Sequence, residues 1–397
     1  MPGGGGNLIC CLPQEILDMV IDPLKDDKPT IYACSRTSRR LRESSRRHLF
    51  HTLRITASDR QGSVFAKLAT FFYNPTSALG VCHHIRKLVL SKSIQLRKVP
   101  ELHFDLLRWL LERLPNLRTL HLRDIGINGE GIDSEEPQAK FPLQELSLVS
   151  VTIDGPYLTL DDILGLFEGI QHLELHDKPK FPISLPMTSS LELNLEKLSL
   201  GFCPDAFLRF LQNTIIQVAT LKCILPPNSQ ALGYLQRFIG FIAPNLVSVQ
   251  LDLCIMGPSS VAWTLDLDFS ICPNLRSLAI LSDCSGEWAA RLSILSRMPP
   301  CLHEITVEFE DRVDIAKLPC RELERLVLEQ FADLERVVFY VSPKYRGSAD
   351  DIFDEPHGMI EAPLSRKGLE DQARKQLAVV LPKLQKRGIL RFDAVEM

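Results

Sequence analysis

The residues that could carry chemistry fall in a few small groups. Cys82-His83-His84 is the tightest Cys and His cluster, and metal binding is the chemistry that such residue types allow. Adjacent residues of an extended chain point to opposite faces, which is poor geometry for one metal ion. The acidic pairs Asp161-Asp162 and Asp266/Asp268 are explained by a helix start and by exposed strand positions. We therefore predict no metal site and no acid–base catalysis at these groups.

Known catalytic and nucleotide-binding patterns are missing from the sequence. It contains no HExxH, GxSxG or Walker sequence, and Gly3 to Gly6 is not followed by the Lys-Ser/Thr of a phosphate loop. Residues 1–7 are therefore predicted to form a flexible tail. We expect neither a cofactor nor an enzymatic activity.

The overall charge excludes a uniformly basic surface of the kind that binds nucleic acid. The chain of 397 residues has 45 Lys and Arg against 49 Asp and Glu, a net charge of −4. One local basic cluster, from Arg36 to Arg47, contains six Arg. A solvated helix face is the favoured interpretation, and nucleic-acid contact and nuclear import are the alternatives.

Cysteine usage and hydropathy indicate the compartment. The 11 Cys are an odd number without any CxxC pair, so reduced thiols are expected rather than disulfides or a zinc ribbon. No stretch reaches the 18 apolar residues of a membrane span, and the start lacks the pattern of a signal peptide. These features predict a cytoplasmic or nuclear protein without membrane contact.

The first fifty residues predict three short helices. Apolar residues at helical spacing between Ile16 and Leu24 line one side of the first helix, which Pro23 ends or kinks. Pro29 suits the first turn of a second helix. Ser38 is a candidate cap for a third helix, whose Leu41 faces inward.

This segment resembles an F-box of the fungal type over residues 8–54. The resemblance rests on Leu12-Pro13-Gln14-Glu15-Ile16-Leu17, on Ala33-Cys34-Ser35-Arg36-Thr37-Ser38-Arg39-Arg40-Leu41 and on His48-Leu49-Phe50. It implies a three-helix module that docks on the Skp adaptor of a cullin-RING ubiquitin ligase. The adaptor-binding residues that it implies are Leu12, Pro13, Ile16, Leu17, Val20, Leu24, Cys34 and Leu41. The alternative is that the same helices only cap the rest of the chain.

A short apolar pattern returns along most of the remaining chain: an apolar residue, two variable ones, an apolar one, one variable and an apolar one. Ten copies begin at Ile85, Leu117, Leu143, Ile170, Leu195, Val218, Leu246, Leu275, Leu302 and Leu323, with a mean spacing of about 26 residues. After Leu334 the pattern is predicted to stop. This spacing resembles that of leucine-rich repeats.

Stacked units of this kind predict an α/β fold. Helix-like stretches such as Glu101 to Arg113 and Gln230 to Ile242 lie between the predicted strands. One unit cannot cover its own apolar face, so we expect an α/β solenoid with parallel strands over residues 85–341. A linker helix in 55–84, an acidic flexible loop over 342–364 and a capping helix and strand over 365–397 complete the prediction. The alternative is an α/β domain with a conventional sheet.

The variable positions of each predicted strand are candidates for binding a partner, because they point away from the apolar layer. The candidate target-binding residues are His121, Arg123, Glu145, His172, Glu174, His176, Lys197, Gln250 and Asp252. The three histidines among them are predicted to be ordinary surface residues rather than metal ligands.

Together these features predict a substrate-recognition subunit of a Skp-cullin-F-box ubiquitin ligase. The N-terminal helices would dock on a Skp-type adaptor and through it on a cullin, while the repeats bind a protein substrate. Such a receptor supplies proximity and needs no nucleophile of its own. The alternative function is a non-catalytic repeat scaffold.

Overall fold

The computed structural model describes the chain from residue 12 to residue 394 with gaps. The described residues are 12–57, 64–73, 80–93, 96, 98–129, 140–154, 158–176, 191–201, 211, 214–225, 229–253, 267–282, 288–310, 319–342 and 374–394. The predicted tail at 1–7 and almost all of the predicted acidic loop at 342–364 lie outside them. The chain divides into two compact units, Met1–Pro186 and Met187–Met397.

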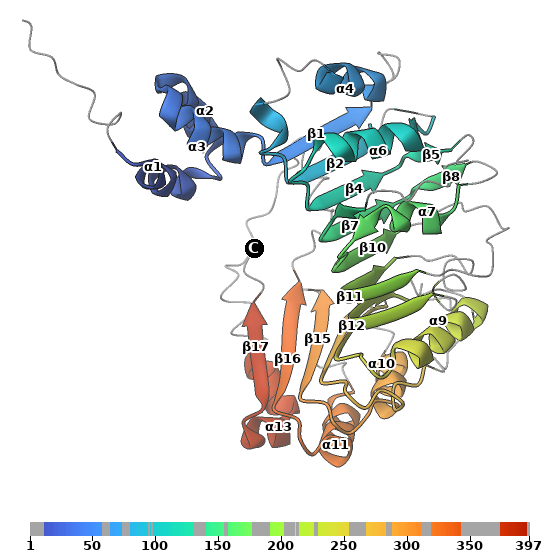
Figure 1. The fold of residues 1–397 in the computed structure, drawn as a ribbon. Coiled ribbons are helices and arrows are strands. Elements are labelled where there is room, and N and C mark those ends of the chain that lie inside the picture. The colour runs from blue at the N-terminus through green and yellow to red at the C-terminus, as the bar shows by residue number, and fades with distance from the viewer. Residues whose placement is uncertain are drawn as a thin grey trace, which may run out of the picture. The chain divides into compact units, whose positions relative to one another are not determined.

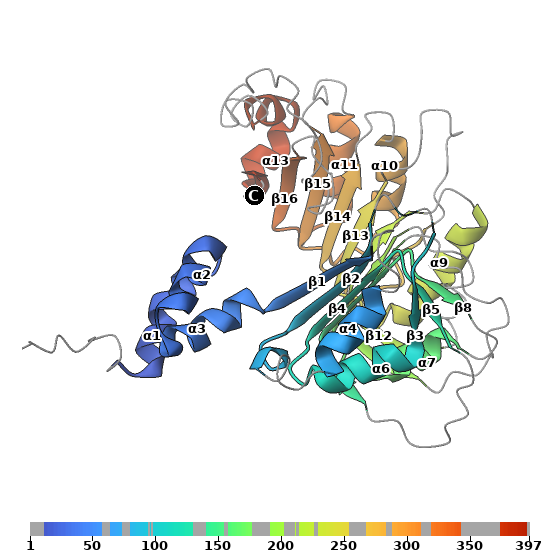
Figure 2. The same ribbon diagram turned by 90° about the horizontal axis from the view of Figure 1, so that it is seen from above.

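The first unit begins with the three predicted helices, which we call the helical module. Its elements are α1 (Gln14–Ile21), the short 3-10 turn η2 (Asp22–Leu24), α2 (Lys28–Thr37) and α3 (Arg39–Leu49), drawn in blue in Figures 1 and 2. Ser38 caps α3 as predicted, since its hydroxyl accepts a hydrogen bond from the Leu41 N–H at 3.1 Å. Leu17, Ile21 and Leu41 form the core of the module.

The rest of the first unit is a parallel sheet with helices between its strands. In hydrogen-bonding order the strands are β1 (Thr52–Ala57), β2 (Lys87–Lys92), β4 (Thr119–Arg123), β7 (Glu145–Val149) and β10 (His172–His176). The helices that follow strands are α4 (Val64–Tyr73), α6 (Phe104–Arg113) and α7 (Leu160–Gly165), and they lie along one side of the strands (Figure 2). Two smaller parallel sheets consist of β3 (Glu101–His103), β5 (Gly126–Asn128) and β8 (Thr152–Asp154), and of β6 (Phe141–Pro142) and β9 (Phe167–Glu168).

The second unit repeats this arrangement. Its parallel strands, in order, are β11 (Glu192–Leu200), β12 (Ile215–Ile224), β13 (Ser248–Asp252), β14 (Ser277–Ser282), β15 (Glu304–Glu310), β16 (Arg336–Ser342) and β17 (Leu390–Ala394). Its helices include α9 (Ser229–Ile242), α10 (Trp288–Ser296), α11 (Cys320–Gln330) and α13 (Pro382–Arg387) (Figure 1). An α/β fold with extensive parallel pairing is therefore confirmed.

The recurrent apolar pattern explains why these segments become strands. In the copy that begins at Leu117, the first, fourth and sixth residues are buried, while the residues between them reach the surface. Before the strand, the N–H groups of Arg118 and Thr119 both donate to the Arg86 carbonyl of the preceding copy, at 2.8 and 3.0 Å. The same pair of hydrogen bonds to one carbonyl oxygen recurs before β2, β7, β10, β14, β15 and β16. The repeat is thus present in the backbone as well as in the sequence.

The last predicted copy of the pattern is wrong. Residues 323–328 lie in helix α11, where Cys320, Leu323, Glu324 and Val327 are buried at helical spacing. The strand comes later, as β16, although the pattern was predicted to stop after Leu334. The sequence pattern does not separate helix from strand here, because two apolar residues three positions apart occur both in a helix and in this strand pattern.

The sheet also extends beyond the predicted repeat boundaries. β1 pairs in parallel with β2 and begins at Thr52, inside the segment assigned to the F-box-like module. The linker predicted for 55–84 therefore contains part of a strand as well as helix α4. At the other end β17 pairs with β16, and the predicted C-terminal helix is split at Leu381, since residues 374–380 and Pro382–Arg387 are separate helices.

Candidate functional site

Helix α1 has two apolar faces, and only one of them is covered. Leu17 and Ile21 are buried against α3, with exposed fractions of 2% and 1%. Ile16, Met19 and Val20 lie on the other side and keep 41%, 69% and 56% of their surface exposed. Burial of such side chains is worth about 1.5–3 kcal/mol each. An uncovered row of this kind on an amphipathic helix is typical of an interaction surface.

We call this surface the α1 apolar face and include in it the exposed residues Leu12, Ile16, Met19 and Val20; Tyr32 on α2 is exposed as well. Four of the eight residues implied by the F-box resemblance are exposed here or beside it, namely Leu12, Pro13, Ile16 and Val20. The other four belong to the interior: Leu17 and Leu41 are buried in the core of the module, and Leu24 and Cys34 pack against it half-buried. The resemblance did not single out Met19 and Tyr32, although their positions next to Val20 and Ile31 in an amphipathic pattern are a usable signal.

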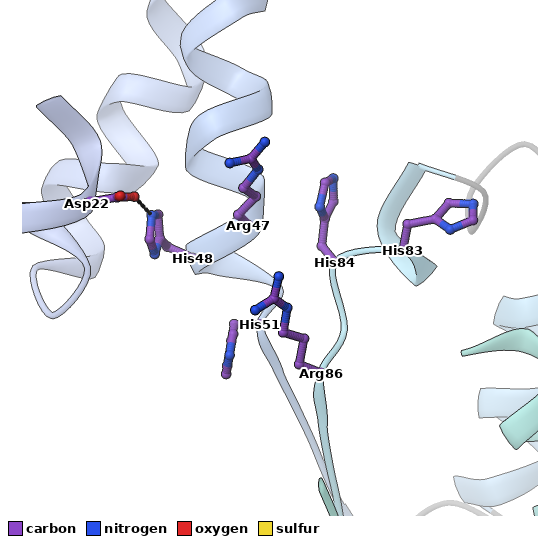
Figure 3. Close-up of a pocket in the computed structure, with 7 residues that line it drawn as sticks. All are labelled: Asp22, Arg47, His48, His51, His83, His84 and Arg86. Atoms are coloured by element: carbon purple, nitrogen blue, oxygen red, sulfur yellow. Dashed lines mark hydrogen bonds and ion pairs between the residues drawn. The ribbon is translucent and has the colours of Figure 1, made fainter. Parts of the chain in front are cut away.

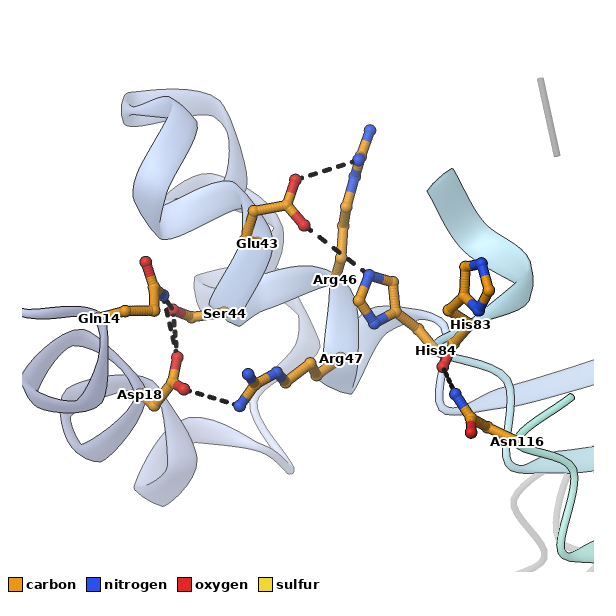
Figure 4. Close-up of polar contacts among 9 residues, drawn as sticks. All are labelled: Gln14, Asp18, Glu43, Ser44, Arg46, Arg47, His83, His84 and Asn116. Atoms are coloured by element: carbon orange, nitrogen blue, oxygen red, sulfur yellow. Dashed lines mark hydrogen bonds and ion pairs between the residues drawn. The ribbon is translucent and has the colours of Figure 1, made fainter. Parts of the chain in front are cut away.

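A polar network holds α1 in place against α3 (Figure 4). Asp18 accepts hydrogen bonds from Gln14 at 3.0 Å, from Ser44 at 2.7 Å and from Arg47 at 2.7 Å. Burial raises the pKa of Asp18, but the hydrogen bonds and the Arg47 charge outweigh it and lower the pKa below 3.8. The ionised carboxylate therefore stabilises the orientation that leaves the α1 apolar face outward.

A second candidate surface is the polar face of β4, β7 and β10, opposite the buried leucines of these strands. The side chains of His121 and Glu145 interact at 3.2 Å, Ser147 donates to Glu174 at 2.7 Å, and Glu174 pairs with His176 at 3.5 Å. The parallel register brings these residues side by side. Six predicted target-binding residues of the first unit thus share one surface: His121, Arg123, Glu145, His172, Glu174 and His176.

The three remaining target-binding candidates lie in the second unit. Lys197 on β11 is exposed and Gln250 on β13 is half-buried, so both can contact a partner. Asp252 keeps only 8% of its surface exposed. This burial contradicts its predicted role as a surface contact, because a partner could reach little of the side chain.

Local structure accounts for the Cys and His cluster and for the acidic residues that were first considered for chemistry. Cys82 is buried and His83 is exposed, in a turn that leads into β2, as expected for a loop-to-strand junction. Asp162 forms a capping box with Thr159 at the start of α7, which confirms the helix-start interpretation. Asp268 lies in a loop before β14 rather than on a strand, and Asp266 is outside the described residues. No group of three or more His, Cys, Asp or Glu suited to a metal ion occurs among the described residues.

Comparison of the sequence with protein-family models and with curated proteins finds no match. Within the described ranges no helix combines the length and the apolar composition that crossing a bilayer requires. The α1 apolar face, the polar face of β4, β7 and β10, and the resemblance of residues 8–54 are therefore the features that point to a function.

Proposed function

We propose that this protein is a substrate-recognition subunit of a Skp-cullin-F-box ubiquitin ligase. In this proposal the helical module docks on a Skp-type adaptor, and the strand-and-helix units, taken as leucine-rich-repeat-like, bind the protein to be ubiquitinated. The chain itself performs no bond-breaking step, since its contribution is to raise the local concentration of its target at the ligase.

The observation that carries the proposal is the α1 apolar face. The module already has its own core, formed by Leu17, Ile21 and Leu41, so the exposed side chains are not needed for its folding. They lie on one helix side and the adjacent start of the module, with Val20 and Met19 more than half exposed. A helix that presents an apolar row can lie in the groove of a partner protein.

The capping alternative requires the chain to cover these same residues. A cap of the repeat array would bury Leu12, Pro13 and Ile16 against neighbouring elements. All three are exposed in the described part of the chain, and Leu12 and Ile16 keep 38% and 41% of their surface accessible. The exposure favours an external partner over an internal role.

The polar face of β4, β7 and β10 is the preferred target-binding surface in this proposal. It combines histidines, carboxylates and the Arg123 guanidinium, a mixture that suits hydrogen bonding to a polar segment of a protein. Sheet faces of this type hold their side chains in fixed positions, since β4 is hydrogen-bonded to β2 and β7, and β7 to β4 and β10.

Co-purification of the full chain with a recombinant Skp adaptor tests the proposal. We expect the intact chain to retain the adaptor and the variant Leu12→Asp/Ile16→Asp to lose it, because two carboxylates would enter an apolar contact. Circular dichroism checks that the variant keeps its helices. Failure of a folded intact chain to bind, or full binding by the folded variant, would reject the proposal.

A further inference from the structure

A pocket of about 470 Å³ lies where the end of α3 meets the segment that leads into β2. Seven residues line it: Asp22, Arg47, His48, His51, His83, His84 and Arg86 (Figure 3). All of these except Asp22 are arginines or histidines. Arg47 and His51 line the pocket from α3 and the residues just after it, and His84 and Arg86 line it from the segment before β2. A volume of this size is within the usual range for small ligands.

Backbone hydrogen bonds hold the two walls of the pocket together. The N–H groups of Arg86 and Lys87 both donate to the His51 carbonyl at 3.0 Å. On the other side the Asn116 side chain donates to the His83 carbonyl at 2.8 Å (Figure 4). The two bonds to His51 fix the distance between the end of the helical module and the start of β2, and the Asn116 bond holds the turn before β2, so the pocket is a built feature of the first unit.

Three carboxylates pair with some of the basic groups of the pocket and leave others without an acidic partner. Asp22 lies 2.9 Å from His48, Asp18 lies 2.7 Å from Arg47, and Glu43 divides its two oxygens between Arg46 at 3.3 Å and His84 at 3.9 Å. Within the described residues, no carboxylate forms an ion pair with the Arg86 guanidinium. Arg86 and His51 therefore line the pocket beside further basic groups and without a paired carboxylate among the described residues.

The titration behaviour of two histidines reflects this excess of positive charge. Burial lowers the pKa of His51, and Arg86, His48 and Lys87 lower it further. Burial also lowers the pKa of His84; Glu43 opposes the shift, while Arg46, Arg47 and His83 add to it. Each of these rings is kept from protonation partly by neighbouring cations, a penalty that a bound anion would remove.

We propose that this pocket binds a phosphate monoester, with its dianionic group held by Arg47, His51, His84 and Arg86. Two guanidinium groups offer paired N–H donors to phosphate oxygens, and the histidine rings add single donors. A cation would be repelled by the same groups, and the polar lining gives an apolar ligand few contacts. The pocket volume exceeds that of the phosphate alone, so the organic part of the ester also has space. This proposal is independent of the adaptor-binding function.

Binding is expected to strengthen as the pH falls. The anion raises the pKa of His51 and His84, so each ring takes up a proton when the ligand binds at a pH between its pKa in the free protein and its pKa in the complex. The other charged groups around the two rings are Asp22, Glu43, Arg46, Arg47, His48, His83, Arg86 and Lys87. Sulfate is the suitable probe for this test, because it stays a dianion while a phosphate ester titrates near pH 6.

Calorimetric titration of the full chain with inorganic phosphate and with sulfate tests the site. We expect about ten-fold weaker phosphate binding for Arg86→Gln, the loss typical of a charge-assisted contact. Arg39→Gln on α3 is the matched control, since it removes the same charge from an exposed position outside the pocket. Sulfate should bind at least about five-fold more tightly at pH 6 than at pH 8 in the wild type, through linkage to the histidines.

Two further titrations distinguish the sources of the phosphate ester. Glucose 6-phosphate represents a free small molecule, and a phosphoserine peptide represents a modified protein. Tighter binding of either one than of inorganic phosphate supports the site and assigns its source. The proposal is overturned if neither phosphate nor sulfate binds, or if Arg86→Gln and Arg39→Gln weaken binding equally.

Discussion

The Glu324 carboxylate is predicted to hold the last helix of the second unit in place. Glu324 lies on α11 with 7% of its surface exposed, and its Oε1 accepts the N–H groups of Lys383 at 2.6 Å and of Leu384 at 3.1 Å. These are two of the N–H groups that the first turn of α13 leaves without a helical partner. Replacement of Glu324 by Ala removes the acceptor for both.

The expected cost follows from the position of each donor. The Leu384 N–H is buried and would lose its only acceptor, whereas Lys383 is exposed and water can replace part of the lost bond. At about 1–3 kcal/mol for a buried unpaired donor and less for an exposed one, we expect about 2–3 kcal/mol of local destabilisation. That corresponds to roughly 30- to 150-fold faster hydrogen exchange in peptides that span α13.

Hydrogen-exchange mass spectrometry of the full chain measures this change. Glu324→Gln keeps an acceptor oxygen, so we expect it to destabilise α13 by about 1 kcal/mol or less. This is the contribution of a negative charge at a helix start. Glu322→Ala removes an exposed carboxylate from the same helix and should leave α13 unchanged. Equal exchange in Glu324→Ala and Glu322→Ala would refute the assigned role of Glu324.

Other predictions concern titration and thiol chemistry. Because the folded pKa of Asp18 is lowered, its stabilisation is present above the ordinary value of 3.8 and is lost as the pH falls through the folded pKa. Protection of the α1 amides, relative to their intrinsic exchange rates, should therefore fall on acidification in the wild type but not in Asp18→Asn. The same acid dependence of protection in both proteins would contradict the network. Burial raises the pKa of Cys223 to about 12 and that of Cys272 and Cys320 to about 11. Alkylation by iodoacetamide at pH 8 should thus label the half-exposed Cys34 far faster than these three in the native chain, and equal rates would show that the thiols are accessible.

The repeats could be predicted from sequence because burial alternates along a strand. In a copy such as Leu117 to Leu122 the apolar positions are buried and the residues between them reach the surface. The copy at Leu323 failed because its apolar residues continue at helical spacing from Cys320 to Val327. The true strand, which follows Leu334, has the same local pattern, and only the packed structure decides between the two segments.

The helical module and the basic pocket show where sequence reasoning ends. Helix starts at Lys28 and Arg39 follow from Pro29 and Ser38, which act locally. Which face of α1 is covered depends instead on contacts with α3, more than twenty residues away. The pocket joins His48 and His51 to His83 and His84 through pairing of β1 with β2, and β1 was not predicted. The sequence signal that could have indicated the pocket is that four of the ten histidines fall in two short segments.

The most direct test of the proposed function is the affinity of the full chain for a Skp adaptor, measured by calorimetry for three proteins. Val20→Asp places a charge on the α1 apolar face, at a side chain that is 56% exposed. Val379→Asp makes the same change at a position that is 78% exposed in the second unit. The proposal predicts binding by the wild type, about 100-fold weaker binding by Val20→Asp and unchanged binding by Val379→Asp, because a buried unpaired charge costs several kcal/mol. No binding by the folded wild type, or equal binding by Val20→Asp and Val379→Asp, would contradict it.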